Sequence, residues 1–169
     1  MSALSRRGAH FIGRFEGWRA EPYDDAAGNA TIGFGHLLHR GPTTARDRTT
    51  WGTLPVERGI ALLIEDAAAA NAAVDLAIHR QLAQCERDAL VSFAFNCGGG
   101  ALDGHVGQAV NAGRDPTAHL EEWSHAGGRV LEGLLRRRQA EARLFVRGDY
   151  GDGSPPAPPR RMHAAQRHY

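Results

Sequence analysis

Apolar residues recur at helical spacing over most of the chain. From Pro55 to about His79 they lie three or four residues apart, which predicts one long helix with Pro55 at its first position. Similar patterns predict further helices over residues 3–15, 84–96, 102–111, 115–125 and 131–147. Glycine lies at or just past the end of several of these ranges, for example Gly17 and Gly148, as is common where a helix ends.

A different pattern occupies residues 19–36. The segments 19–24 and 31–36 read as strands, and the turn-forming sequence DDAAGNA lies between them, with Gly28-Asn29 able to adopt positive φ. This pattern predicts a β-hairpin. Residues 38–54 contain Gly41-Pro42, Gly52 and many Thr and Arg residues, and are expected to be irregular and exposed. The whole pattern predicts an α+β fold that is predominantly helical.

Composition limits the class of protein. A chain of 169 residues with 42% hydrophobic and 23% charged residues suits one soluble domain that folds without disulfides or metal. Its 20 basic and 19 acidic residues nearly balance, which argues against a dedicated nucleic-acid binder. The segment 151–169 is rich in Pro, Gly and Arg and has almost no apolar anchor, so it is expected to be disordered.

The cysteines and the apolar runs bear on location. Cys85 and Cys97 fall on one predicted helix about 18 Å apart, too far for a disulfide, so free thiols are expected, as suits a cytoplasmic protein. No signal peptide is expected, since the N-terminus lacks an apolar core of useful length. No apolar run approaches the roughly 20 residues of a membrane span.

The second predicted strand carries the first sign of chemistry. Strand alternation places the apolar side chains of Ile32 and Phe34 on one face. The opposite face would offer one hydroxyl beside two residues without side chains, a surface that lets a bulky ligand approach the backbone. Its residues are Thr31, Gly33 and Gly35.

Two carboxylates flank this surface, Glu16 at the end of the first predicted helix and Asp25 in the hairpin turn. Two carboxyl groups and a hydroxyl around a groove suit glycoside hydrolysis. Burial of Glu16 against Phe15 and Trp18 would raise its pKa and keep it protonated, while an exposed Asp25 would stay ionised. The hydroxyl of Thr31 would hold the attacking water. Taken alone, the residues also fit a solvated helix end and a simple turn former.

The spacing of these residues resembles that of the phage-type lysozymes, the endolysin muramidases of glycoside hydrolase family 24. Eight residues separate Glu16 from Asp25, and five separate Asp25 from Thr31. Asp24 stands beside Asp25, but only Asp25 fits this spacing. The resemblance covers nearly all of residues 5–150. Its three blocks are FEGWRAEPYDDAAGNATIGFGH at 15–36, ALVSFAFNCGGGAL at 89–102 and AGGRVLEGLLRRRQAEARLFVRGDY at 126–150.

The resemblance implies cleavage of the β-1,4 bond between N-acetylmuramic acid and N-acetylglucosamine in peptidoglycan. Glu16 would be the general acid, and Asp25 would orient or activate water with the help of Thr31. No metal or organic cofactor is implied. The implied architecture is a lysozyme-like catalytic domain over residues 1–150 with a cleft between two lobes. It comprises a small lobe over about 12–54, a connecting helix over about 55–79 and a helical lobe over about 80–150.

Further site residues follow from matching the same blocks. His36 would pair with Asp66 near the middle of the connecting helix and support the hairpin. Arg137 would face the cleft and pair with Glu16, although three consecutive arginines on a helix point in three directions and are usually solvated. Asn96 would line the cleft and bind sugar amides. The nine histidines show no metal-ligand spacing and are interpreted as surface or core residues.

The function indicated is that of an endolysin that lyses bacterial walls. Two alternatives stay open at this stage: a secreted bacterial toxin muramidase with the same chemistry, and a wall-binding module without catalysis. The expected partner is peptidoglycan, with no nucleic acid and no stable membrane insertion, and a monomer is expected. The protein would accumulate in the host cytoplasm and reach the wall after holin-type release.

Overall fold

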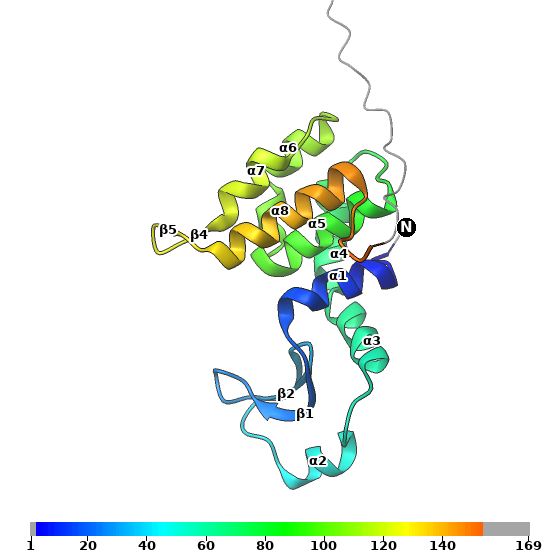
Figure 1. The fold of residues 1–169 in the computed structure, drawn as a ribbon, viewed down its shortest axis with the longest axis vertical. Helices are drawn as coiled ribbons and strands as arrows, with labels where there is room; N and C mark the ends of the chain where they lie inside the picture. Colours follow the sequence, from blue (N-terminus) through cyan, green and yellow to red (C-terminus); the bar gives the residue numbers. More distant parts are fainter. Residues whose placement is uncertain (1–2, 154–169) are drawn as a thin grey trace, which may run out of the picture. The chain divides into compact units, whose positions relative to one another are not determined.

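The computed structural model describes residues 3–153, which divide into two compact units (Figure 1). The N-terminal unit is Arg6–Ala68. The helical unit comprises residues 3–5 and 69–153 of the described chain. The fold is α+β and predominantly helical, as predicted.

The N-terminal unit combines three helices with one antiparallel sheet in the order β1-β2-β3. Its core contains Ile32, Leu54 and Leu62, against which two tryptophan rings and Leu38 pack. Its elements are α1 (Arg6–Glu16), β1 (Arg19–Asp24), β2 (Ala30–Gly33), β3 (His36–His39), α2 (Ala45–Trp51) and α3 (Val56–Asp66).

The sheet has one more strand than the predicted hairpin. β2 ends at Gly33, the chain turns, and β3 begins at His36, so the prediction of one strand over residues 31–36 was wrong. Gly33 has φ of 68° and Gly35 has φ of 91°, in the left-handed region that glycine favours and that a strand does not use. The strand alternation therefore stops at Gly33.

The predicted open face of glycines is also wrong at Gly33. A Cβ atom there would lie 3.3 Å from Cδ2 of Leu54 and 3.6 Å from Cζ3 of Trp18. Gly33 is therefore covered by side chains of its own unit. Of the two glycines of the predicted face, Gly35 does have open space beside its Cα, since no heavy atom lies within 4 Å of a Cβ built there.

The segment 38–54 is mostly exposed, as predicted, although Leu54 is buried. It is not irregular, because it contains the helix α2, which has no buried residue. Thr44 caps α2: its hydroxyl accepts the N–H of Asp47, whose carboxylate accepts the Thr44 N–H at 2.7 Å. The hydrogen bonds from Thr44, and then the one from His39, hold the pKa of Asp47 far below its usual range. Because no residue of α2 is buried, its sequence has no periodic apolar residues from which a helix could be predicted.

Two aromatic rings join the sheet to the helices of this unit. The rings of Trp18 and Phe34 lie 4.7 Å apart. Phe34 packs on Gly13 of α1, where a Cβ atom would lie 2.9 Å from the ring, and Trp18 packs on Gly59 of α3, where a Cβ atom would overlap the indole. Both helices therefore need glycine at the contact.

The predicted single helix over residues 55–79 is two helices, α3 and α4 (Ala68–Ala77). Pro55 is the N-cap of α3, one position before the place predicted for it. Ala67 lies between the two helices with ψ of 0°, well away from the α-helical value of about −42°. The apolar spacing continues through Ala67, so periodicity alone could not reveal the break.

In the helical unit α5 packs along α8, as Figure 1 shows. The predicted helices 84–96 and 131–147 are confirmed to within one residue, and both free cysteines lie on α5, as predicted. The helix predicted for 115–125 begins later, because Pro116 is its N-cap, and ends earlier, because a 3₁₀ helix follows it at residues 122–124. The elements after α4 are α5 (Gln84–Cys97), η1 (Gly99–Leu102), α6 (His105–Asn111), α7 (Thr117–Glu121), η2 (Glu122–Ser124), β4 (His125–Ala126), β5 (Arg129–Val130) and α8 (Glu132–Arg147).

Two further predictions concern the membrane and the C-terminal segment. Among residues 3–153, no helix combines the length and the apolar character that crossing a membrane requires. The segment predicted to be disordered, 151–169, falls outside the described residues from position 154 onward.

A buried carboxylate ties both ends of the described chain to α5. Asp88 is fully buried and accepts hydrogen bonds from four donors. The hydroxyl of Tyr150 donates to Oδ2 at 2.7 Å, and Ser5 donates both its hydroxyl and its N–H. Gln84 donates from its side-chain amide at 2.9 Å. Burial, and then the bond to Asp88, raise the pKa of Tyr150. The carboxylate is thus satisfied by residues far apart in the chain.

We expect Tyr150→Phe to lower the free energy of unfolding by about 2 kcal/mol, because a buried carboxylate loses a charge-assisted hydrogen bond. Urea denaturation followed by circular dichroism measures the change. Tyr23→Phe is the matched control, since the Tyr23 hydroxyl makes no hydrogen bond with any described residue, and it should change stability by less than about 0.5 kcal/mol. Equal losses in the two variants would contradict the role given to the Tyr150 hydroxyl.

Candidate active site

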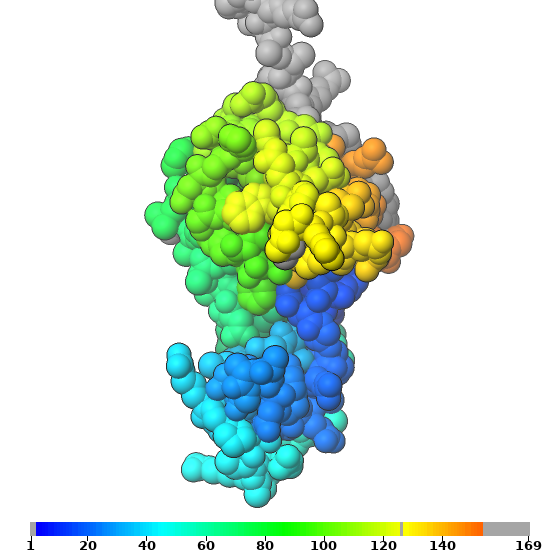
Figure 2. Space-filling view, turned by 90° about the vertical axis from the view of Figure 1, so that its left-hand side faces the viewer, coloured from blue at the N-terminus to red at the C-terminus, as the bar shows by residue number. Residues whose placement is uncertain are grey.

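The turn between β1 and β2 belongs to the segment drawn in blue in Figure 2, at the surface of the N-terminal unit. Asp25 organises this turn. Its Oδ1 accepts the N–H groups of Ala27 and Asn29, both at 2.8 Å. The Asn29 side chain and the Gly28 N–H also lie close enough to the carboxylate to lower its pKa. The turn-former interpretation is therefore correct for Asp25, whose side chain is held by the backbone of its own turn.

The same hydrogen bonds control the charge of Asp25. The N–H of Asn29 is the largest influence, and together with the N–H of Ala27 it holds the pKa of Asp25 below its usual value against an opposing effect of partial burial. Hydrogen bonds to the ionised form favour that form. Asp25 therefore has the properties expected of a carboxylate that must stay ionised.

Thr31 lies in β2 with 3% of its surface exposed. Its hydroxyl donates to the carbonyl oxygen of Asn29 at 3.1 Å, which leaves the hydroxyl oxygen's lone pairs as acceptors. The backbone of Asn29 thus contacts Asp25 through its N–H and Thr31 through its C=O.

Sequence reasoning missed this role of Asn29. It offered only the possibility of a positive φ, whereas Gly28 has φ of 78° and Asn29 does not adopt a positive φ. The Asn29 side chain has its own task, since its Oδ1 accepts the N–H of Gly41 at 3.2 Å. An asparagine after a glycine in a turn was the available signal.

Asp24, the neighbour of Asp25, makes a different hydrogen bond. It is the last residue of β1, and its Oδ1 accepts the N–H of Thr43 at 2.7 Å. That bond fixes the end of β1 to the residues that lead into α2. The two adjacent acids are thus distinguished by their partners, Thr43 for one and the turn backbone for the other.

Glu16 is the last residue of α1 and is half-buried. Gly17, with φ of 75°, ends the helix and leads the chain towards β1. α1 is held to the sheet by the contact of Phe34 with Gly13. Glu16, Asp25 and Thr31 therefore all belong to one packed unit.

His36 lies against Asp66, with Nδ1 at 2.9 Å from Oδ1 and 3.0 Å from Oδ2. Asp66 is the last residue of α3 rather than the middle of a longer helix. The pair joins the first residue of β3 to the end of α3, and the Trp51 ring lies 6.2 Å from the imidazole. Its predicted effect on the site stays a prediction.

The three consecutive arginines of α8 differ sharply in exposure. Arg136 is exposed and pairs with Glu132 at 3.4 Å, whereas Arg137 and Arg138 are buried, so the expectation that most of them are solvated was wrong. Arg137 donates to Glu141 from Nε at 3.2 Å. Its predicted pairing with Glu16 would join the two units and stays a prediction.

Glu141 is the centre of this buried network. It is fully buried and accepts the Ser92 hydroxyl at 2.7 Å as well as the guanidinium groups of Arg137 and Arg138. Burial raises the pKa of Glu141, while the two guanidinium groups and the Ser92 hydroxyl oppose that rise. Nε of Arg138 lies 2.7 Å from Oε2 without the alignment of a hydrogen bond, so that contact acts through charge.

Arg138 extends the network to Asn96, whose amide oxygen accepts from Nη2 at 3.0 Å. Asn96 is exposed, and this bond leaves its NH₂ group as the part that could meet a sugar. Sequence reasoning missed Glu141 and Arg138. Their spacing was the only signal, and that spacing also suits an exposed surface pair.

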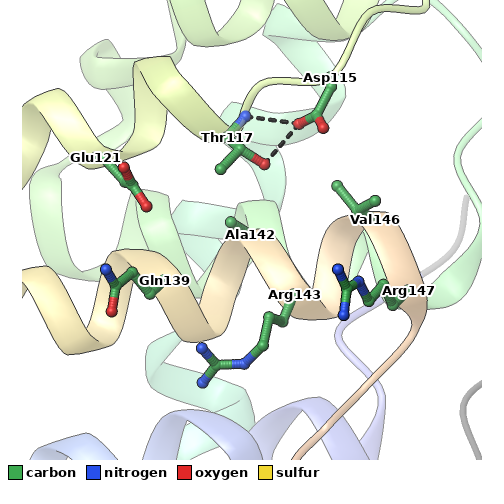
Figure 3. A pocket seen from close by; sticks show the side chains of 8 residues that line it. All are labelled: Asp115, Thr117, Glu121, Gln139, Ala142, Arg143, Val146 and Arg147. Carbon is green, nitrogen blue, oxygen red and sulfur yellow. Dashed lines mark hydrogen bonds between the residues drawn. The ribbon is translucent and has the colours of Figure 1, made fainter.

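A hollow of about 530 Å³ lies between α7 and α8 of the helical unit (Figure 3). Of the residues that line it, Thr117 donates hydrogen bonds from its N–H and its hydroxyl to Oδ1 of Asp115. No predicted site residue lines the hollow. Its lining residues are Asp115, Thr117, Glu121, Gln139, Ala142, Arg143, Val146 and Arg147. The hollow is therefore separate from the residues predicted to act in catalysis.

We expect Glu141→Gln to lower the free energy of unfolding by about 3 kcal/mol, because two buried guanidinium groups would lose their counter-charge. Glu132→Gln is the control on the same helix. It removes only the exposed pair with Arg136 and should change stability by less than about 1 kcal/mol. Denaturant unfolding compares the two variants, and a Glu141→Gln variant as stable as the control would show that Glu141 carries no needed charge.

The chain is similar in sequence to known proteins. A family model described as Phage lysozyme matches residues 13–141. The endolysin of Bacillus phage B103 is 34% identical over 151 residues, covering 86% of this chain and 55% of the relative. The endolysin of Lactococcus phage c2 is 35% identical over 150 residues, covering 84% and 59%. The chain thus spans little more than half the length of these two relatives.

Two solved structures share the fold over nearly the full length of their chains. The endolysin from Escherichia coli O157:H7 phage FAHEc1 superposes with a TM-score of 0.70 at 30% identity, covering 92% of this chain and 98% of that one. The muramidase domain of SpmX from Asticaccaulis excentricus gives 0.69 at 32% identity, covering 86% and 99%. With the family model matching most of its residues, this chain belongs to the phage lysozyme family.

Proposed function

We propose that the protein is a muramidase that hydrolyses the β-1,4 bond between N-acetylmuramic acid and N-acetylglucosamine in peptidoglycan. The observation that carries the proposal is the state of Asp25 in a member of this family. Two backbone N–H groups hold one carboxylate oxygen, and the pKa of Asp25 is lowered. A carboxylate that is fixed in place and ionised can orient a water molecule and stabilise positive charge on the sugar.

In the proposed reaction Glu16 gives its proton to the glycosidic oxygen as the bond from that oxygen to the sugar C1 breaks. A water molecule forms the new bond to C1 and passes its proton to Asp25. The charge that develops on the sugar is that of an oxocarbenium ion, which the carboxylate of Asp25 stabilises.

Thr31 would position the water. Because its hydroxyl proton is directed at the Asn29 carbonyl, its oxygen can accept a hydrogen bond from water. Asn29 fixes Asp25 and Thr31 through one peptide backbone, which supports joint action on a single water molecule. The proposed supporting groups are His36 with Asp66, Arg137 opposite Glu16, and Asn96 on the sugar amides.

The proposed biological role is that of an endolysin. The relatives from Bacillus and Lactococcus phages carry that name, and the proposal extends it to this chain. The site of action would be the cell wall, which the protein would reach from the host cytoplasm after holin-type release, acting as a monomer.

We expect Glu16→Gln to reduce the release of reducing ends from purified cell walls by at least about 10²-fold, because the leaving oxygen loses its proton donor. Glu21→Gln is the matched control, an exposed glutamate of β1 in the same unit, and should keep wild-type turnover. Circular dichroism checks that both variants fold. Near-wild-type turnover by Glu16→Gln would remove Glu16 from its role.

The products that the wild-type protein releases from cell walls distinguish a hydrolase from a lytic transglycosylase and from a binding module. Mass analysis should find ends that carry intact N-acetylmuramic acid. Anhydro ends would instead indicate a lytic transglycosylase, and wall binding without new ends would indicate a binding module.

We expect Asp25→Asn to lower turnover by at least about 10²-fold while the turn stays intact. The asparagine oxygen can still accept the N–H groups of Ala27 and Asn29, so only the charge is lost. Asp24→Asn makes the same chemical change one residue away, keeps an acceptor for Thr43, and should leave turnover within about twofold. Equal losses would mean that the spacing selected the wrong acid.

A further inference from the structure

We propose that His105, His119 and Glu122 form a binding site for a transition-metal ion of the Zn²⁺ class on the helical unit. One ligand atom from each residue can be chosen so that all three lie within 4.8 Å of one another. None of these residues has a part in the proposed glycosidase chemistry. The inference therefore stands independently of the proposed function.

The three residues come from neighbouring short elements. His105 is the first residue of α6, His119 lies in α7, and Glu122 is the first residue of η2. His119 and Glu122 are three residues apart, a spacing that places side chains on one face of a helix. α6 and α7 pack against each other, so the third ligand arrives through a tertiary contact. The segment that carries them, green-yellow to yellow in Figure 2, lies at the surface of its unit.

The distances suit an ion after small side-chain movements. Nδ1 of His119 lies 3.2 Å from Oε1 of Glu122, and Nδ1 of His105 lies 3.8 Å from Oε2. The two imidazole rings have centroids 5.2 Å apart. Bonds of about 2.0–2.2 Å from Zn²⁺ to nitrogen and oxygen require ligand atoms roughly 3–4 Å apart. The carboxylate is already within this range of both rings.

Exposure makes the remaining adjustment easy. The exposed fractions of the side chains are 70% for His105, 58% for Glu122 and 35% for His119. Exposed side chains can rotate without disturbing a packed core, and a fourth position would stay open to water. The protein would thus supply three of the four ligands of the ion, and water would supply the fourth.

The donor set selects the class of metal. Two imidazole nitrogens with one carboxylate favour Zn²⁺, Cu²⁺ or Ni²⁺, whereas Ca²⁺ and Mg²⁺ prefer oxygen ligands alone. Glu122 also neutralises part of the charge that the ion brings. A bound ion would join the start of α6 to the end of α7 and so stabilise this part of the helical unit.

The test is calorimetric titration of the metal-free full chain with ZnCl₂ at neutral pH. We expect one ion per chain with saturable binding, and a melting temperature that rises with zinc. His105→Gln and His119→Gln should each weaken binding by at least about tenfold, since loss of a residue that only hydrogen-bonds to a metal ligand already weakens binding by about that factor. His79→Gln removes another exposed histidine of the same unit and should leave the affinity unchanged.

Co²⁺ supplies a second readout, because its visible absorption reports ligand type. Glu122→Gln should weaken Co²⁺ binding and alter that spectrum while circular dichroism stays unchanged. The proposal is overturned if the wild-type chain shows no saturable binding. It is also overturned if the double variant His105→Gln/His119→Gln binds zinc as well as the wild type does. Loss of wall hydrolysis in Glu16→Gln has no bearing on either result.

Discussion

The packing of two aromatic rings on two glycines is the constraint on which the candidate site depends. Phe34 lies on Gly13 of α1, and Trp18 lies on Gly59 of α3. A methyl group at either glycine would enter the space of a ring, so the close approach is a property of the backbone itself. Because the sheet is held to both helices in this way, Glu16 at the end of α1 has a defined position relative to the strands that frame Asp25.

Two buried carboxylates of the chain differ from Asp25 in their surroundings. Asp88 and Glu141 are fully buried, and several donors surround each of them. A buried charge without such partners would be strongly destabilising, so these acids are committed to the fold. Asp25 is only partly buried, and the backbone N–H groups of its own turn hold it. A carboxylate that is held in place but not enclosed by the core can still meet water.

Sequence patterns predicted the elements whose burial is regular, and failed where the fold depends on single backbone positions or on distant contacts. The helices α5 and α8 carry apolar residues at helical spacing and were predicted to within one residue. α2 has no buried side chain, so it had no period to detect. The break at Ala67 and the end of β2 at Gly33 follow from single dihedral angles that leave the apolar pattern unchanged.

The candidate site was predictable as far as its chemistry is local in sequence. Glu16, Asp25 and Thr31 lie within 16 residues, and a spacing shared with a known family selected Asp25 over Asp24. What the spacing could not supply is the reason for that choice, namely that Asp24 is bonded to Thr43 while Asp25 is held by its own turn. Contacts between distant residues, such as Ser92 with Glu141, arise only when helices pack. Whether an arginine or a histidine is a surface group or part of a site is therefore decided by its neighbours in space.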